Sequence, residues 1–255
     1  MIFDTHAHYD DDAFDEDRDV LLSGMREQNV EYIVNVGASM ASSERSIKLA
    51  EKYPFVYAAV GVHPDEVGEL DEEKFEKLRK WTSHEKVKAV GEIGLDYYWD
   101  KEKHDLQKHW FMRQMELASE VKLPMIVHSR EAAKDTLDMV IAAKPLNLSG
   151  IIHCYSYSVE QAREYLNMGY YIGIGGVVTF KNAKKLKEVA EYTPLSQIVL
   201  ETDCPYLSPV PFRGKRNSSR NIPYIVDAIA QMKGVTAEEV IAVTNENAKK
   251  VFRLI

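Results

Sequence analysis

Two hydrophobic patterns alternate along the chain. Short apolar runs, many of them β-branched, are typical of buried strands, and stretches with apolar residues every three or four positions are typical of helices with one buried face. Eight runs have the strand pattern, at residues 1–10, 31–39, 55–64, 87–96, 124–129, 149–155, 170–176 and 197–203. The helical pattern follows at residues 14–29, 42–53, 71–81, 101–121, 131–143, 159–168, 182–192, 221–232 and 237–254.

Eight successive strand-and-helix units in 255 residues predict an α/β fold, a (β/α)8 TIM barrel. A doubly wound open sheet is the alternative. With 45% hydrophobic residues and no linker-like or low-complexity segment, residues 1–255 are expected to form a single domain. We expect a cytoplasmic protein with no membrane contact, because no apolar run is long enough to cross a bilayer and Met1 leads directly into a strand.

Metal-ligating side chains recur where the strand runs end. His6 and His8 are two positions apart, so on a strand they face the same way and can hold one ion between them. Four later runs also end in a possible ligand: Glu92, His128, His153 and Asp203. Because parallel strands deliver their carboxyl ends to one rim of a barrel, we expect all these side chains to meet there.

Six candidate ligands are more than one four-coordinate ion needs, so the sequence predicts two divalent ions. Glu92 has two carboxylate oxygens and is the expected bridge between them. The other expected ligands are His6, His8 and Asp203 for one ion, and His128 and His153 for the other. Mixed histidine and carboxylate ligation favours Zn²⁺ or Mn²⁺ over Mg²⁺ but leaves the identity open among the three.

One further histidine is expected at the same rim. His63 follows the third strand in the sequence GVHP and is not needed for coordination. Contact with a substrate and a structural role are both open for it. We expect the first.

The chain is acidic overall but has one basic segment. A formal net charge of −8 argues against a protein that coats nucleic acid by general attraction. After the eighth strand, however, the segment PFRGKRNSSR contains four basic residues and no acidic residue. Arg213 and Arg216 offer planar forks suited to phosphate, so this loop is expected to bind a polyanionic substrate locally.

Several of these segments together resemble the TatD family of metal-dependent deoxyribonucleases, within the amidohydrolase superfamily. The similar motifs are DTHAHYD, GVHPDE, VGEIGLDYYWD, PMIVHSREA, IIHCYSYS, YIGIGG and ETDCPYLSPVPFRGKRN. The resemblance implies a distorted TIM barrel and a divalent-metal site, and it matches all six ligand positions one by one. Residues 217–220 read Asn-Ser-Ser-Arg where the family more usually has Asn-Glu-Pro, so the course of this loop is not implied.

The activity that the resemblance implies is hydrolysis of DNA phosphodiester bonds. In that reaction Glu92 and Asp203 are the expected catalytic residues, Asp203 as the proton acceptor. DNA is then the expected partner, and no obligate protein partner is indicated. Two other hypotheses remain: an amidohydrolase acting on a small cyclic amide, lactone or aminoacyl ester, and a metal-binding protein without catalysis.

Overall fold

The computed structural model describes residues 1–99 and 102–255. Asp100, the last residue of one motif above, and Lys101, where a helix was expected to begin, lie outside the described residues. The chain forms two compact units, which we call the terminal unit (Met1–Asn35 with Cys154–Ile255) and the central unit (Val36–His153). Each is described in turn.

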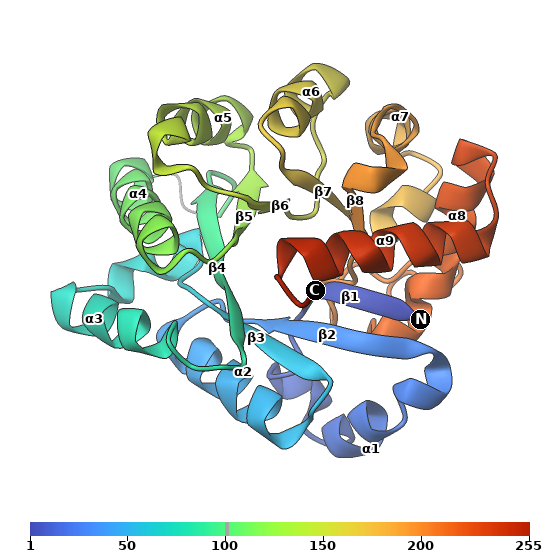
Figure 1. The fold of residues 1–255 in the computed structure, drawn as a ribbon, viewed down its shortest axis with the longest axis horizontal. Coiled ribbons are helices and arrows are strands. Elements are labelled where there is room, and N and C mark those ends of the chain that lie inside the picture. The colour runs from blue at the N-terminus through green and yellow to red at the C-terminus, as the bar shows by residue number, and fades with distance from the viewer. Residues whose placement is uncertain (100–101) are drawn as a thin grey trace. The chain divides into compact units, whose positions relative to one another are not determined.

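The terminal unit contains strands from both ends of the chain (Figure 1). Its strands are β1 (Ile2–Ala7), most of β2 (Val30–Val36), β7 (Tyr171–Ile174) and β8 (Ile198–Leu200). Its helices are α1 (Arg18–Ser23), α6 (Val159–Asn167), α7 (Lys184–Tyr192), α8 (Ile222–Lys233) and α9 (Ala237–Val251). A parallel bridge between Ala7 and Cys204 places the segment after β8 beside the end of β1, so the last strand adjoins the first.

Helix α9 packs along β1 (Figure 1). Asn245 Nδ2 donates to the Met1 carbonyl oxygen at 2.8 Å, and the Phe252 ring stacks on Phe3 with centroids 5.7 Å apart. Asn247 Nδ2 also donates to the Ile198 carbonyl at the start of β8, at 2.8 Å. These contacts lie at the amino ends of β1 and β8, whereas the candidate ligands lie towards or beyond their carboxyl ends.

The central unit is a run of parallel strands with a helix before each. Its strands are β3 (Val56–Val60), β4 (Val87–Asp96), β5 (Met125–Arg130) and β6 (Gly150–Ile152). Its helices are α2 (Met40–Lys52), α3 (Glu72–Trp81), α4 (His104–Val121) and α5 (Ala133–Ala142). In the β4–β5 pair, Gly94 lies opposite His128 and Asp96 lies opposite Arg130. This register brings the carboxyl end of β4 level with the candidate ligand on β5.

The strand order confirms the predicted (β/α)8 barrel. Within residues 1–99 and 102–255, eight strands are ordered β1 to β8 in one sheet, and a helix follows each of them. A doubly wound sheet instead reverses its strand order at a switch point, which this order does not do. None of the described helices is long and apolar enough to cross a membrane.

The helix expected at residues 14–29 is wrong in extent. The structure has α1 flanked by two 3₁₀ turns, η1 (Asp12–Phe14) and η2 (Arg26–Gln28). Asp11 caps η1 by accepting a hydrogen bond from the Ala13 N–H, and Gly24 ends α1. Short polar side chains and glycine both favour turns over a continued helix, so the apolar spacing persists without one long helix.

Candidate metal centre

Three side chains of the terminal unit direct their ligand atoms to one point. His6 lies on β1, His8 follows it directly, and Asp203 follows β8. His6 Nε2 is 3.1 Å from His8 Nε2, and Asp203 Oδ1 is 3.8 Å from the first and 3.4 Å from the second. Ligand atoms about 2.0–2.2 Å from an ion in tetrahedral geometry lie roughly 3.3–3.6 Å apart. The three distances fall below, within and above this range, and the three ligand atoms are close enough together to hold one ion.

Backbone hydrogen bonds hold the two segments that supply this group. The Asp203 N–H donates to the His6 carbonyl oxygen at 2.9 Å, and the His8 N–H donates to the Cys204 carbonyl oxygen at 2.8 Å. Asp203 has a φ of 57°, in the left-handed region that few residues other than glycine adopt. The exchange of hydrogen bonds thus fixes a strained turn that places the carboxylate opposite the two imidazoles.

A buried carboxylate lies behind this turn. Asp4 Oδ2 accepts from the Thr202 and Ser219 hydroxyls, both at 2.7 Å, and its Oδ1 accepts from the Thr202 N–H at 3.1 Å. Burial raises the pKa of Asp4 to about 7, against the hydrogen bonds that lower it. Ser219 belongs to residues 217–220, so the end of the basic loop is tied to this buried carboxylate.

The central unit contains a second group of candidate ligands. His128 Nδ1 lies 2.8 Å from Glu92 Oε1, and His153 Nε2 lies 3.9 Å from the same oxygen. The ring of His63 meets the ring of His128 edge to face, with centroids 4.3 Å apart. His63, Glu92 and His128 offer ligand atoms close enough together to hold an ion.

Asp96 completes this group, and the sequence analysis missed it. Its Oδ2 lies 3.0 Å from His128 Nε2, and its Oδ1 accepts from the N–H groups of Tyr98 at 2.8 Å and Trp99 at 3.1 Å. The signal was present, because Glu92 and Asp96 are four positions apart on one strand and share a face. A carboxylate behind a ligating histidine is the usual partner that orients the ring.

The two carboxylates change the acid–base behaviour of His128. Burial lowers the pKa of this imidazole, but the hydrogen bonds to Asp96 and Glu92 outweigh it and raise the pKa to about 9. For Asp96, burial raises the pKa, and the hydrogen bonds from His128 and the loop N–H groups outweigh it, so its pKa is lowered. Asp96 is therefore an anion near neutral pH and can hold the ring in one orientation.

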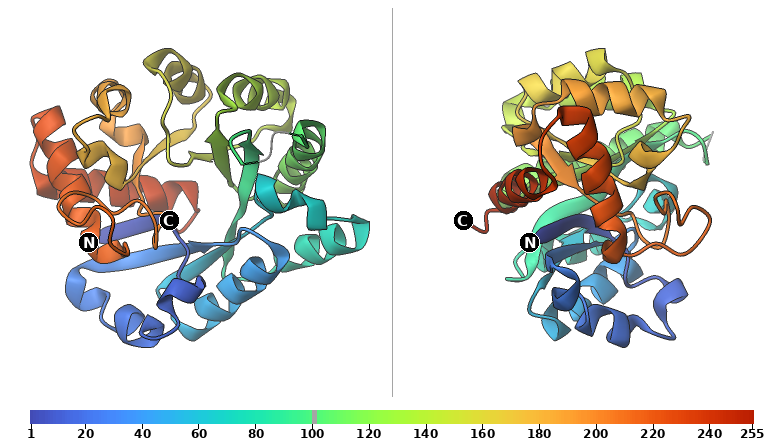
Figure 2. Two further views of the ribbon diagram at one scale, coloured as in Figure 1. Left: turned by 180° about the vertical axis from the view of Figure 1, so that it is seen from behind. Right: turned by 90° about the vertical axis from the view of Figure 1, so that its right-hand side faces the viewer.

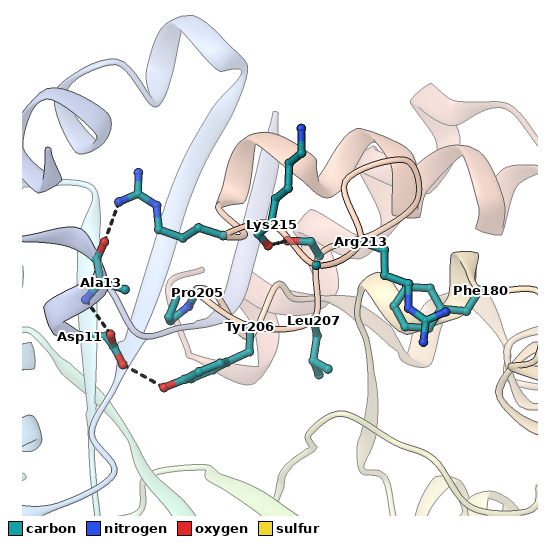
Figure 3. A pocket seen from close by; sticks show the side chains of 11 residues that line it. Asp11, Ala13, Phe180, Pro205, Tyr206, Leu207, Arg213 and Lys215 are labelled. Atoms are coloured by element: carbon teal, nitrogen blue, oxygen red, sulfur yellow. Dashed lines mark hydrogen bonds between the residues drawn. The ribbon is translucent and has the colours of Figure 1, made fainter.

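The basic loop after β8 lines a pocket of about 660 Å³ in the terminal unit (Figure 3). Arg216 pairs through both of its terminal nitrogens with Asp17 and also donates to the Ala13 carbonyl oxygen at 2.6 Å. Arg213 instead lies over the ring of Phe180, 4.5 Å from its centroid. Figure 2 shows this segment as an orange loop. The two arginines thus line the same pocket, but Arg216 is paired with a carboxylate and Arg213 lies against an aromatic ring.

The structure therefore brings most of the predicted site residues into two groups. His6, His8 and Asp203 meet in the terminal unit, and Glu92, His128, His153 and His63 gather in the central unit. Their roles as ligands, the bridging role of Glu92 and the substrate contact of His63 stay predictions. So does phosphate binding by Arg213 and Arg216.

The chain is similar to metal-dependent hydrolases over its whole length. A family model described as "TatD related DNase" matches residues 3–253. The uncharacterized metal-dependent hydrolase YabD of Bacillus subtilis is 43% identical, with all of both chains covered. The uncharacterized metal-dependent hydrolase YcfH of Escherichia coli is 34% identical, with all of this chain and 96% of the relative covered.

A solved structure has the same fold. The crystal structure of YjjV, a TatD homologue from Escherichia coli, matches with a TM-score of 0.93 and 29% identity. The match covers 99% of this chain and 98% of that chain. This likeness agrees with the sequential strand order described above.

Proposed function

The chain belongs to the TatD-related DNase family of metal-dependent hydrolases, and from this premise we propose that it hydrolyses the phosphodiester bonds of DNA. The observation that carries the proposal is the convergence of His6 Nε2, His8 Nε2 and Asp203 Oδ1 within 3.8 Å of one another. The whole chain acts as one catalytic domain in this proposal.

The ligands divide between two divalent ions of Zn²⁺, Mn²⁺ or Mg²⁺. One ion is assigned to His6, His8 and Asp203, the other to His128 and His153, and Glu92 is assigned to both. Such ions, when bound, lower the pKa of a coordinated water towards about 7 and polarise a phosphoryl oxygen. Neutral imidazoles and carboxylates supply the deprotonated ligands that this binding requires.

The chain's own residues then position the substrate and move the proton. The Asp203 side chain is 20% exposed, so its carboxylate can accept a proton at the surface of the site. Asp96 fixes the ring of His128, and Glu92 is hydrogen-bonded on the other side of that ring. His63, packed against His128, is assigned to the substrate phosphate or the leaving oxygen.

The basic loop is assigned to the phosphates that flank the cleaved bond. Its two arginines take separate parts: Arg213 contacts phosphate, whereas Arg216 anchors the loop through Asp17. A guanidinium that lies over an aromatic ring still has N–H donors at its own edge to offer to an anion. Arg213 on Phe180 is therefore preorganised for an anion. Such contacts bind DNA without reading its sequence.

The test is degradation of end-labelled DNA. The protein is stripped of metal, each divalent ion is added back separately, and single- and double-stranded substrates are compared. Turnover that appears only with metal supports the proposal. Turnover of cyclic amides, lactones or aminoacyl esters, with none of DNA, would establish the amidohydrolase alternative instead. Stoichiometric metal binding without turnover of any substrate would show a non-catalytic protein.

A further inference from the structure

Large apolar side chains are exposed directly after the candidate catalytic carboxylate. Tyr206, Leu207 and Val210 follow Asp203 within seven positions and are 55%, 38% and 47% exposed. Exposed apolar residues scattered singly need no explanation, but a group of them beside a reactive site suggests a binding surface. The assigned functions of this loop, which concern phosphate alone, do not use these side chains.

Tyr206 is held both by its backbone and by the hydroxyl of its ring. Its backbone N–H donates to the Asp203 carbonyl oxygen at 2.9 Å, and its hydroxyl donates to Asp11 Oδ2 at 2.9 Å. Asp11 is itself held by the Ala13 N–H at 2.8 Å. Burial and the bond to Asp11 raise the pKa of Tyr206 to about 12, so the hydroxyl keeps its proton near neutral pH. A ring held in this way offers a rigid flat surface at little entropic cost.

The same ring lines the pocket that contains Arg213 (Figure 3). The lining combines aromatic and aliphatic surface from Tyr206, Leu207 and Phe180 with the cations Arg213 and Lys215. Asp11 also lines the pocket, and one of its carboxylate oxygens already accepts the hydrogen bond from the Tyr206 hydroxyl. Apolar surface with a few charged groups is the usual composition of a small-ligand pocket, and about 660 Å³ is a usual size.

We propose that this pocket binds the nucleotide next to the cleaved bond, with its base stacked on Tyr206 and its phosphate against Arg213. The inference rests on the proposed function and deepens it, because it assigns a base contact to a site so far given only phosphate contacts. Every base has a flat face, so stacking on an aromatic ring tolerates any sequence. The backbone hydrogen bond from Tyr206 to Asp203 keeps Tyr206 next to the residue that carries the candidate catalytic carboxylate.

The experiment uses dithymidylate phosphorylated at both ends, which has a single bond between nucleosides to cut. Two analogues replace one thymidine or the other with an abasic tetrahydrofuran residue. Hydrolysis is measured for the parent protein and for Tyr206→Ala, Tyr206→Phe and Tyr192→Ala. Tyr192 is the matched control, an exposed tyrosine (42%) at the end of α7 that lies outside the pocket lining. Binding of the same ligands is measured without turnover, in excess chelator.

Loss of one stacked base typically weakens binding by about 5- to 150-fold. We expect Tyr206→Ala to raise KM for the full substrate by a factor in that range. One of the two abasic analogues should do the same with the parent, and Tyr206→Ala should then add no further loss on that analogue. Tyr206→Phe, which keeps the ring, and Tyr192→Ala should stay close to the parent.

Three outcomes separate the two proposals. If Tyr206→Ala raises KM equally for the full substrate and for both abasic analogues, or leaves KM unchanged, base stacking is excluded while the DNase proposal stands. If the parent cuts no DNA with any ion, the DNase proposal fails. In that case, base-dependent binding that Tyr206→Ala abolishes still supports the pocket assignment, and base-independent binding overturns it. Thermal unfolding of Tyr206→Phe and Tyr206→Ala checks that both variants fold.

Discussion

His128 and Asp96 form a close pair at the carboxyl ends of neighbouring strands, with Nε2 of the imidazole 3.0 Å from Oδ2 of the carboxylate. The pair follows from the register of β4 and β5, which places Asp96 two positions beyond the residue opposite His128. Because Glu92 contacts Nδ1 of the same ring at 2.8 Å, the imidazole is held between two carboxylates. Asp96 therefore helps to fix the orientation of the His128 ring, which we propose as a metal ligand.

Replacing Asp96 by asparagine tests this role. Asparagine keeps an oxygen for the Tyr98 and Trp99 N–H groups but puts an NH₂ group or a neutral oxygen against His128. Loss of such an orienting partner typically weakens metal affinity by about 10- to 100-fold. Competition against a chelator measures the change. Asp138→Asn on α5, an exposed pair with Lys134, is the control. Unchanged metal affinity in Asp96→Asn would show that metal binding does not depend on the contact between Asp96 and His128.

Glu92→Gln and Asp203→Asn test the catalytic assignments. Each removes a charge that the proposed reaction needs in its transition state, so kcat should fall on the order of a thousandfold, by analogy with other single catalytic groups. Bound metal and the rate of DNA hydrolysis are measured together. Glu73→Gln, an exposed position on α3, is the control. Full activity in Glu92→Gln would contradict a shared carboxylate between two ions.

His63→Gln decides between two roles for a residue that packs against His128. As a substrate contact, His63 should be dispensable for metal content but needed for turnover, so kcat falls while bound metal stays constant. If His63 is instead a metal ligand, the variant should bind less metal, and its turnover per bound metal should stay constant. Metal analysis with single-substrate kinetics separates the two, and His84→Gln, partly exposed beside Glu51, is the control.

The raised pKa of His128 predicts a pH dependence of metal binding. In the metal-free protein this imidazole is protonated up to about pH 9, and a metal ion must displace that proton. Apparent affinity should therefore rise about tenfold per pH unit between roughly 7 and 9 and flatten above it. Calorimetry in buffers of different ionisation enthalpy should show proton release near neutral pH. No proton release at pH 7 would contradict the prediction.

The same shift has an opposite effect on the stability of the metal-free protein. The pKa of His128 is raised above the ordinary 6.5 in the folded state, so the folded protein holds the proton more tightly than the unfolded chain. The stabilisation is fully present below about pH 6.5 and is lost as the pH rises through about 9. Chelator-treated protein should lose stability over this range in urea unfolding, and Asp96→Asn should reduce the loss.

The sequence predicted what depends on local pattern. β4 spans Val87–Asp96 as expected, because an apolar run bounded by turns is enough to define a buried strand. The barrel followed from counting such runs. His153 and Asp203 do lie just after their strands, whereas Glu92, expected where its strand ends, lies in the middle of β4. Asp96 was within reach of the same argument, since alternate residues of a strand share a face.

What the sequence could not predict depends on contacts between distant residues. Arg216 and Asp17 are 199 positions apart, and no local pattern indicates that the Asp17 carboxylate pairs with the Arg216 guanidinium. In the sequence, Arg213 and Arg216 look equivalent, three positions apart in one basic loop. Only the folded chain shows that Arg216 is paired with a carboxylate and that Arg213 lies over the Phe180 ring.

This difference predicts separate effects for the two arginines in the binding of a polyanion. Each cation that neutralises a phosphate contributes a slope of roughly −0.7 to the dependence of log affinity on log salt for single strands. Arg213→Gln should raise KM for DNA and flatten that slope by about this amount, while hydrolysis of a small phosphodiester stays nearly unchanged. Arg163→Gln, on α6 beside Tyr192, is the control.

Arg216→Gln should act through the loop, because its charge is already paired with Asp17. The Asp17 carboxylate, whose pKa the Arg216 hydrogen bond lowers, then loses its partner, and the loop loses its anchor at the Ala13 carbonyl. We expect a higher KM for DNA with little change in salt slope, and partial rescue by Asp17→Asn in the double variant. If Arg216→Gln flattened the slope as much as Arg213→Gln, both guanidinium groups would contact phosphate, and the Asp17 pair would have to open when DNA binds.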